Sequence, residues 1–262
     1  MIEPRPGTRE GQDIIQLSPK NGVITFLDWD DTILCTTYLR KSGIRLNDVL
    51  IDHIFEFYNR ILLECETIAY NLIVKMMQNS FICIVTASEA GWVQMSCKKF
   101  YPKLYPLLDQ MFIISAKSAF ISSSTTEIIY DFEEQYRWKK LAMEEILYKM
   151  DTSSLNMVIS IGDGECEKMA CKDVVDEKLP PHVVCKTIKL KEQTNYIRVY
   201  EQLIILEREW NNSICNNMKL DNLDFEIDLS LIPCREISFR ELASAIESVT
   251  EATIVRFFQS SR

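Results

Sequence analysis

Short, continuous apolar runs recur along the chain and predict buried β-strands. Runs of this length that end abruptly at polar residues are typical of strands that helices cover on both faces. The runs are Val23–Leu27, Phe81–Val85, Met111–Ser115 and Met157–Ile161, with Val183–Ile188 as a candidate fifth. They predict a sheet with two buried faces.

Helical periodicity fills the intervals between these runs. From Leu46 to Gln78 there is no Gly or Pro, and apolar residues recur at helical spacing, which predicts one long helix or two short ones. Further helices are predicted at Gly91–Phe100, Tyr136–Met150 and Gln193–Trp210, whereas Ser118–Ile128 is loop-like. Strands that alternate with helices favour an α/β fold, here a Rossmann-like three-layer α/β/α sandwich with a mostly parallel sheet.

The same pattern predicts a catalytic domain over residues 21–214. Residues 1–20 are rich in Pro and Gly and are expected to form an irregular lead-in. Residues 215–262 hold an acidic alternating stretch over 220–230 and a helical pattern over 239–258, and we expect them to form an extension packed on the domain. The intervals after the first and second predicted strands leave no room for a large cap domain.

Polar clusters directly follow three of the predicted strands. They are Asp28–Thr32, Thr86–Ser88 and Asp163–Glu167. In open parallel sheets, ligands bind beyond the carboxyl ends of the strands, so we expect the three clusters to meet at one edge. Each segment alone is more typical of a turn or a helix cap, and the functional interpretation depends on all three following buried strands in order.

Carboxylates at such an edge suit phosphoryl transfer. This reaction needs a nucleophile, an acid for the leaving group, and cations to offset charge on the phosphoryl oxygens. Asp28 is the candidate nucleophile, and Asp30 is the candidate general acid and base. Mg²⁺ prefers carboxylate, carbonyl and water oxygens, and Asp163 offers a further carboxylate for it.

Composition and charge narrow the class of protein. The chain has 262 residues and a net charge of −9, which disfavours general nucleic-acid binding because an acidic surface repels phosphate backbones. The two histidines, His53 and His182, are too few for a zinc site built from several histidines. The nine cysteines include no CxxC pair and are expected to be buried thiols in a reducing compartment. No signal-peptide or membrane-spanning pattern is present, so we expect a cytoplasmic protein.

The ordered set of motifs resembles the haloacid dehalogenase (HAD) superfamily of phosphohydrolases over about residues 22–190. The matching residues are Asp28, Asp30 and Thr32 in FLDWDDT, Thr86 in ICIVTAS, Lys139 in YRWKKLA with Lys140 as the alternative, and Asp163 and Glu167 in SIGDGECE. The segments DWDDT, VTASEAGWV, ISAK and WKKLA are also similar to a little-described eukaryotic branch of this superfamily.

This resemblance implies a Mg²⁺-dependent phosphatase. The enzyme would hydrolyse a phosphomonoester through an aspartyl-phosphate on Asp28, with Asp30 as acid and base. Thr86 and Lys139 would hold the phosphoryl oxygens. The metal ligands would be Asp28, the backbone carbonyl of Asp30, and Asp163.

Thr32 and Glu167 would support this set. Glu167 stands where the superfamily more often has Asp, so whether it touches the metal stays open. Trp29 and Trp92 are candidates for lining the pocket or for buried packing.

A site without a large cap is open, which favours a bulky phosphorylated substrate such as a phosphoprotein. The alternative from another class is a catalytically silent HAD-like scaffold or binding module. A phosphomutase would need a cap to exclude water, and none is predicted.

Overall fold

The computed structural model describes residues 17–46, 52–120, 132–192, 195–215 and 224–226. Six parallel strands form one sheet in the order β3-β2-β1-β4-β5-β6. The strands are β1 (Val23–Leu27), β2 (Phe81–Thr86), β3 (Phe112–Ser115), β4 (Met157–Gly162), β5 (Val184–Lys189) and β6 (Asp224–Glu226).

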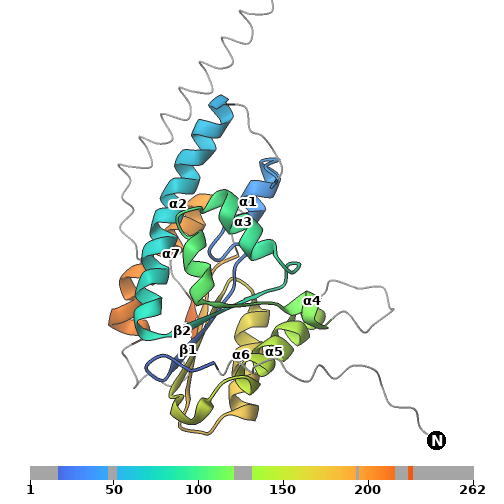
Figure 1. The fold of residues 1–262 in the computed structure, drawn as a ribbon, viewed down its shortest axis with the longest axis vertical. Coiled ribbons are helices and arrows are strands. Elements are labelled where there is room, and N and C mark those ends of the chain that lie inside the picture. The colour runs from blue at the N-terminus through green and yellow to red at the C-terminus, as the bar shows by residue number, and fades with distance from the viewer. Residues whose placement is uncertain (1–16, 47–51, 121–131, 193–194, 216–223, 227–262) are drawn as a thin grey trace, which may run out of the picture.

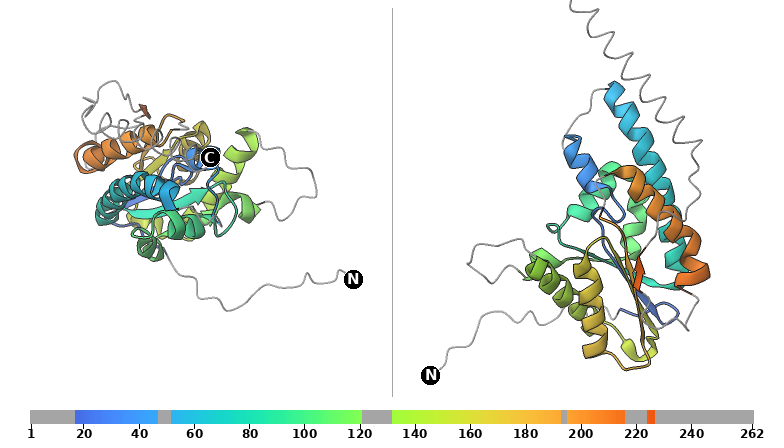
Figure 2. Two further views of the ribbon diagram at one scale, coloured as in Figure 1. Left: turned by 90° about the horizontal axis from the view of Figure 1, so that it is seen from above. Right: turned by 180° about the vertical axis from the view of Figure 1, so that it is seen from behind.

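Helices cover both faces of the sheet (Figures 1 and 2). They are α1 (Thr36–Lys41), α2 (Asp52–Asn79), α3 (Trp92–Phe100), α4 (Ala116–Phe120), α5 (Phe132–Tyr148), α6 (Glu165–Lys178) and α7 (Tyr196–Glu209). The short helical segments are η1 (Tyr105–Gln110), η2 (Thr152–Ser154) and η3 (Trp210–Ile214). Among the described residues, no helix is long and apolar enough to cross a bilayer.

Two apolar clusters hold the three layers together, one on each face of the sheet. Val23 and Leu27 of β1 pack in the cluster that includes residues of α2, α3 and α7. Ile24 and Phe26, at the alternate positions, pack in the cluster that includes residues of α5 and α6. This alternation explains why β1 reads as a continuous apolar run, because each side chain meets a helix layer on one face or the other.

The predicted α/β/α class is confirmed, with local differences at element ends. The segment predicted as one helix or two is the single helix α2 in its described part. Helix α5 begins at Phe132 rather than Tyr136, with Glu133 and Glu134 in its first turn, where negative charge complements the helix dipole. The start of the stretch expected to be loop-like belongs to α4. Residues 121–128 and the helical pattern over 239–258 lie outside the described residues.

Chain order places a crevice at the centre of the sheet. From β1 the chain builds outward through β2 and β3, and then returns to the other side of β1 to build β4, β5 and β6. The direction of winding reverses between β1 and β4, and such a reversal leaves a crevice beyond the strand ends, where ligands bind. Asp28 follows β1 and Asp163 follows β4, so both flank this crevice.

The described residues around the crevice form no inserted domain. Between β1 and β2 they form only α1 and α2, and between β2 and β3 only α3 and η1. At the other end of the chain, β6 pairs with β5, so residues 224–226 of the carboxyl-terminal extension extend the sheet.

Candidate active site

Asp28 is fixed where β1 ends. Its backbone N–H donates to the carbonyl of Ile161 in β4 (N···O 2.9 Å), and its side chain is buried. The loop that follows is tight: Asp31 adopts a left-handed φ of 54°, and the N–H groups of Ile33 and Leu34 both donate to the Trp29 carbonyl at 3.0 Å. Asn and Asp tolerate this backbone region better than most residues, which accounts for Asp31 at the turn.

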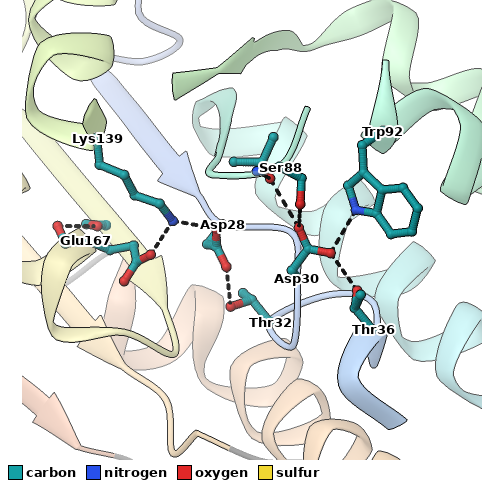
Figure 3. Close-up of polar contacts among 10 residues, drawn as sticks. Asp28, Asp30, Thr32, Thr36, Ser88, Trp92, Lys139 and Glu167 are labelled. Atoms are coloured by element: carbon teal, nitrogen blue, oxygen red, sulfur yellow. Dashed lines mark hydrogen bonds and ion pairs between the residues drawn. The ribbon is translucent and has the colours of Figure 1, made fainter. Parts of the chain in front are cut away.

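Lys139 joins Asp28 to Glu167 in a buried ion triad (Figure 3). Its Nζ lies 2.6 Å from Asp28 Oδ1 and also donates to Glu167 Oε1, and only 2% of the Lys139 surface is exposed. The other oxygen of Asp28, Oδ2, accepts from the hydroxyl of Thr32 at 3.1 Å. Lys140, the alternative in the sequence, instead pairs with Glu177 at 2.7 Å outside the site.

Burial and charge set the pKa values within the triad. Burial raises the pKa of Asp28 to about 7, since the lowering effect of the Lys139 ammonium is opposed by the charges of Glu167 and Asp30. Burial alone would lower the pKa of Lys139, but Asp28 and Glu167 outweigh it and raise that pKa. Burial also acts to raise the pKa of Glu167, yet the Lys139 ammonium holds it below the usual value. Lys139 is therefore a permanent cation held between two acids.

The Gly-Asp-Gly segment after β4 is shaped by Glu167. A Cβ atom built on Gly162 would lie 2.7 Å from Glu167 Cγ, and one built on Gly164 would collide with Glu167 Oε2. Both glycines therefore allow the Glu167 side chain to fold back toward Lys139. Asp163, between them, is partly exposed, and burial together with the charges of Asp28, Glu167 and Asp31 raises its pKa to about 8.

Asp30 belongs to a second network, on the other side of the loop (Figure 3). Its Oδ1 accepts from the hydroxyl of Thr36 at 2.6 Å and from the indole Nε1–H of Trp92 at 2.8 Å. Its Oδ2 accepts from the hydroxyls of Ser88 at 2.7 Å and Thr86 at 3.2 Å. Two carboxylates only two positions apart thus have separate surroundings: Asp28 meets an ammonium and Asp30 meets neutral donors.

The acidic side of the crevice gathers several carboxyl groups around one ammonium. The carboxylates of Asp28, Asp31, Asp163 and Glu167 act on one another electrostatically, with the Lys139 ammonium opposing them. Glu167 Oε2 is buried and has no hydrogen-bond partner among the described residues. Within the described ranges, no group of three or more His, Cys, Asp or Glu side chains forms a ready-made metal cage. Mg²⁺ commonly binds through one or two carboxylates, with water and substrate phosphate completing its shell.

An acidic cleft of about 620 Å³ opens beside this cluster. Its carboxylates are those of Asp31, Asp163, Glu165, Glu167 and Glu192, and no Lys or Arg of the described chain lines it. The charged side chains that line this cleft are therefore all negative.

The sequence motifs identified most of the residues that meet at the crevice. Asp28, Thr32, Lys139 and Glu167 form the first network, and Asp30 and Thr86 belong to the second. Sequence reasoning missed the contacts that Thr36, Ser88 and Trp92 make to Asp30. Ser88 and Trp92 stand close after Thr86 in the chain, and a search for donors near the second motif would have found them.

Comparisons with protein-family models, with curated proteins and with solved structures find no match. The functional assignment therefore depends on the site itself.

We predict that Lys139→Met strongly destabilises the fold, because it leaves Asp28 and Glu167 buried without their cation. Breaking a buried ion pair by removing one partner costs about 3–5 kcal/mol. Urea denaturation measures the loss, and Lys140→Met is the matched control, expected to stay within about 0.5 kcal/mol of the native protein because Lys140 pairs at the surface. Equal stability of the two variants would contradict the role given to Lys139.

We predict that Asp163→Asn stabilises the metal-free protein. The raised pKa of Asp163 means that the folded state resists its ionisation, so native stability falls as pH rises from about 4 towards 8, and Asn removes this loss. With a chelator present to remove metal, the melting temperature of the variant at pH 8 should be roughly 2–4 °C higher than that of the native protein. This is the shift that a gain of about 1 kcal/mol in the free energy of unfolding produces in a domain of this size. The gain should shrink at pH 5, and a gain of the same size at both pH values would contradict the electrostatic explanation.

Proposed function

We propose that this protein is a Mg²⁺-dependent phosphatase that hydrolyses a phosphomonoester through an aspartyl-phosphate on Asp28. The observation that carries the proposal is the separation of Asp28 and Asp30 into two networks at one strand end. One carboxylate is paired with a fixed ammonium and the other with neutral hydroxyl and indole donors. Two carboxylates with different surroundings can take different roles in one reaction.

In the first step, a carboxylate oxygen of Asp28 attacks the phosphorus atom and the bond to the leaving oxygen breaks. Asp30, in its protonated form, gives its proton to that oxygen. In the second step, Asp30 takes a proton from water as the water oxygen attacks phosphorus. The acyl-phosphate bond then breaks, and inorganic phosphate and the free Asp28 carboxylate are released.

The remaining residues balance charge and orient the phosphoryl group. Lys139 places a buried cation beside the attacking oxygen, and Thr86 presents a hydroxyl at the end of β2. The residues suited to hold Mg²⁺ are Asp28, Asp163 and the backbone carbonyl of Asp30. When bound, Mg²⁺ would offset the repulsion between the carboxylate nucleophile and the phosphate dianion.

The substrate that we propose is bulky and carries positive charge near its phosphate, as a basic phosphopeptide or phosphoprotein segment does. No described residue forms a large cap over the crevice, and the cleft beside it is lined by carboxylates. Opposite charges raise the rate of encounter and select between partners. We also propose a cytoplasmic location, where the buried, free cysteines of the described residues would stay reduced.

We predict that the native protein hydrolyses p-nitrophenyl phosphate only with Mg²⁺, and that Asp28→Asn lowers the turnover number by on the order of 10³-fold or more. Asp151→Asn is the matched control, since Asp151 caps η2 away from the crevice and should leave turnover unchanged. Release of p-nitrophenol measures both. A native protein with no turnover and no Mg²⁺-dependent rise in melting temperature would be a silent scaffold.

We predict that a phosphopeptide with Lys or Arg beside the phosphoserine is hydrolysed on the order of 10-fold faster at low concentration than its Glu-flanked counterpart. Phosphate release from the two peptides gives the ratio of kcat/KM. Glu192→Gln, at the exposed rim of the cleft, should reduce this ratio, and added salt should reduce it further. A ratio near one, or efficient hydrolysis of small sugar phosphates alone, would contradict the proposed substrate class.

A further inference from the structure

The two oxygens of the Asp30 carboxylate have donors of different kinds. Within the described part of the chain, Oδ2 accepts only from hydroxyls, those of Thr86 and Ser88, which lie at the carboxyl end of β2. Oδ1 accepts from the Thr36 hydroxyl in α1 and from the Trp92 indole in α3. The carboxylate thus has one side towards the proposed phosphoryl-binding residue and one side away from it.

The Thr86 hydroxyl that donates to Oδ2 can donate to another acceptor instead. A hydroxyl has a single proton, so Thr86 is unable to donate to Asp30 and to a phosphoryl oxygen at the same time. The Thr86 oxygen is itself fixed, because it accepts from the Ser88 backbone N–H at 3.0 Å. Turning the Thr86 proton towards a phosphoryl oxygen therefore needs no movement of the chain, and it removes one donor from Oδ2.

The Trp92 indole that donates to Oδ1 is unable to turn its N–H to another acceptor. An indole N–H points in one direction set by its ring, and it has no acceptor capacity. Trp92 begins α3 after Gly91, which adopts a left-handed φ of 85°, and its backbone N–H donates to the Glu89 carbonyl at 3.1 Å. The ring is therefore anchored to a helix start, and the Nε1–H to Oδ1 distance of 2.8 Å is that of a well-formed hydrogen bond.

We propose that Trp92 is a positioning residue that holds Oδ1 of Asp30 while substrate draws away the Thr86 donor of Oδ2, so that Oδ2 is the oxygen that delivers the proton. This role rests on the proposed function, because it assigns the proton to one atom of the proposed acid. Thr36 assists at the same oxygen. The proton moves from Oδ2 to the leaving oxygen as the bond to phosphorus breaks, and it returns to Oδ2 from water in the second step.

Leaving-group dependence separates this role from a purely structural one. An alkoxide leaves poorly without a proton, whereas p-nitrophenolate leaves well without one, so a misplaced acid slows alkyl phosphates more. Trp92→Phe deletes the N–H and keeps a ring. We expect kcat for an alkyl phosphate to fall on the order of 10-fold more than kcat for p-nitrophenyl phosphate, with little change in KM.

Trp210→Phe is the control. Trp210 is fully buried in η3, where its neighbour Asn211 contacts Asn79 at the end of α2, so this variant shrinks a buried indole without altering the loop that carries Asp30. It should lower the melting temperature and leave the alkyl-to-aryl ratio at the native value. Thr36→Val should shift the ratio in the same direction as Trp92→Phe. An unchanged ratio in Trp92→Phe, with native turnover present, would overturn the positioning role and leave the proposed function intact.

A second measurement does not depend on catalytic turnover by the protein. The chain has four tryptophans, so the indole N–H signals in a proton–nitrogen spectrum are few, and each is assigned by its loss in a Trp→Phe variant. Asp30→Asn should move the Trp92 signal and leave the Trp210 signal in place. With Mg²⁺ and orthovanadate, the Trp92 N–H should remain protected from exchange with water. A Trp92 signal that ignores Asp30→Asn, or that becomes unprotected with orthovanadate, would overturn the role. Absent native turnover would instead count against the phosphatase itself.

Discussion

The buried Lys139 ammonium is the interaction on which the rest of the site depends. Three ionised groups at the end of a sheet would be costly to desolvate singly, and they persist because each satisfies another. The triad ties α5 to the end of β1 and to the start of α6, so it fixes the relative position of three elements as well as three charges. The glycines on either side of Asp163 follow from it, since side chains there would displace Glu167.

The triad also makes the two sides of the crevice differ in charge. On one side, several carboxyl groups surround a single cation, and burial together with the neighbouring carboxylates raises the pKa values of Asp28 and Asp163. On the other side, Asp30 is surrounded by neutral donors. A fold that needed only stability would be better served by apolar side chains at the position of the triad. The charged triad therefore costs folding stability, and such a cost is common at the functional sites of enzymes.

Much of this organisation is readable in the sequence, for a simple physical reason. Strands covered on both faces must be apolar throughout, so β1 was bounded correctly at both ends. The strands of a parallel sheet end at one edge, so the sequence alone predicts that Asp28 and Asp163 lie at the same edge. The motif resemblance left Lys140 as the alternative to Lys139, because it asks only for a lysine on this helix and the partner of each lysine decides between them. The contact of Thr36 with Asp30 escaped prediction because it depends on the turn at the left-handed residue Asp31, whose path has no periodic signal.

Strand β6 matters for the order in which the sheet is completed during synthesis of the chain. Without β6, the edge of β5 would present unpaired backbone groups, and exposed edges of this kind invite pairing between molecules. Residues 224–226 cover part of that edge, and they are synthesised after every other strand of the sheet. During synthesis from the amino terminus, the remaining strands can assemble while this edge is still bare. Protection from edge-to-edge aggregation therefore comes last, and a chain that stopped before residue 224 would retain the proposed active-site residues and lose that protection.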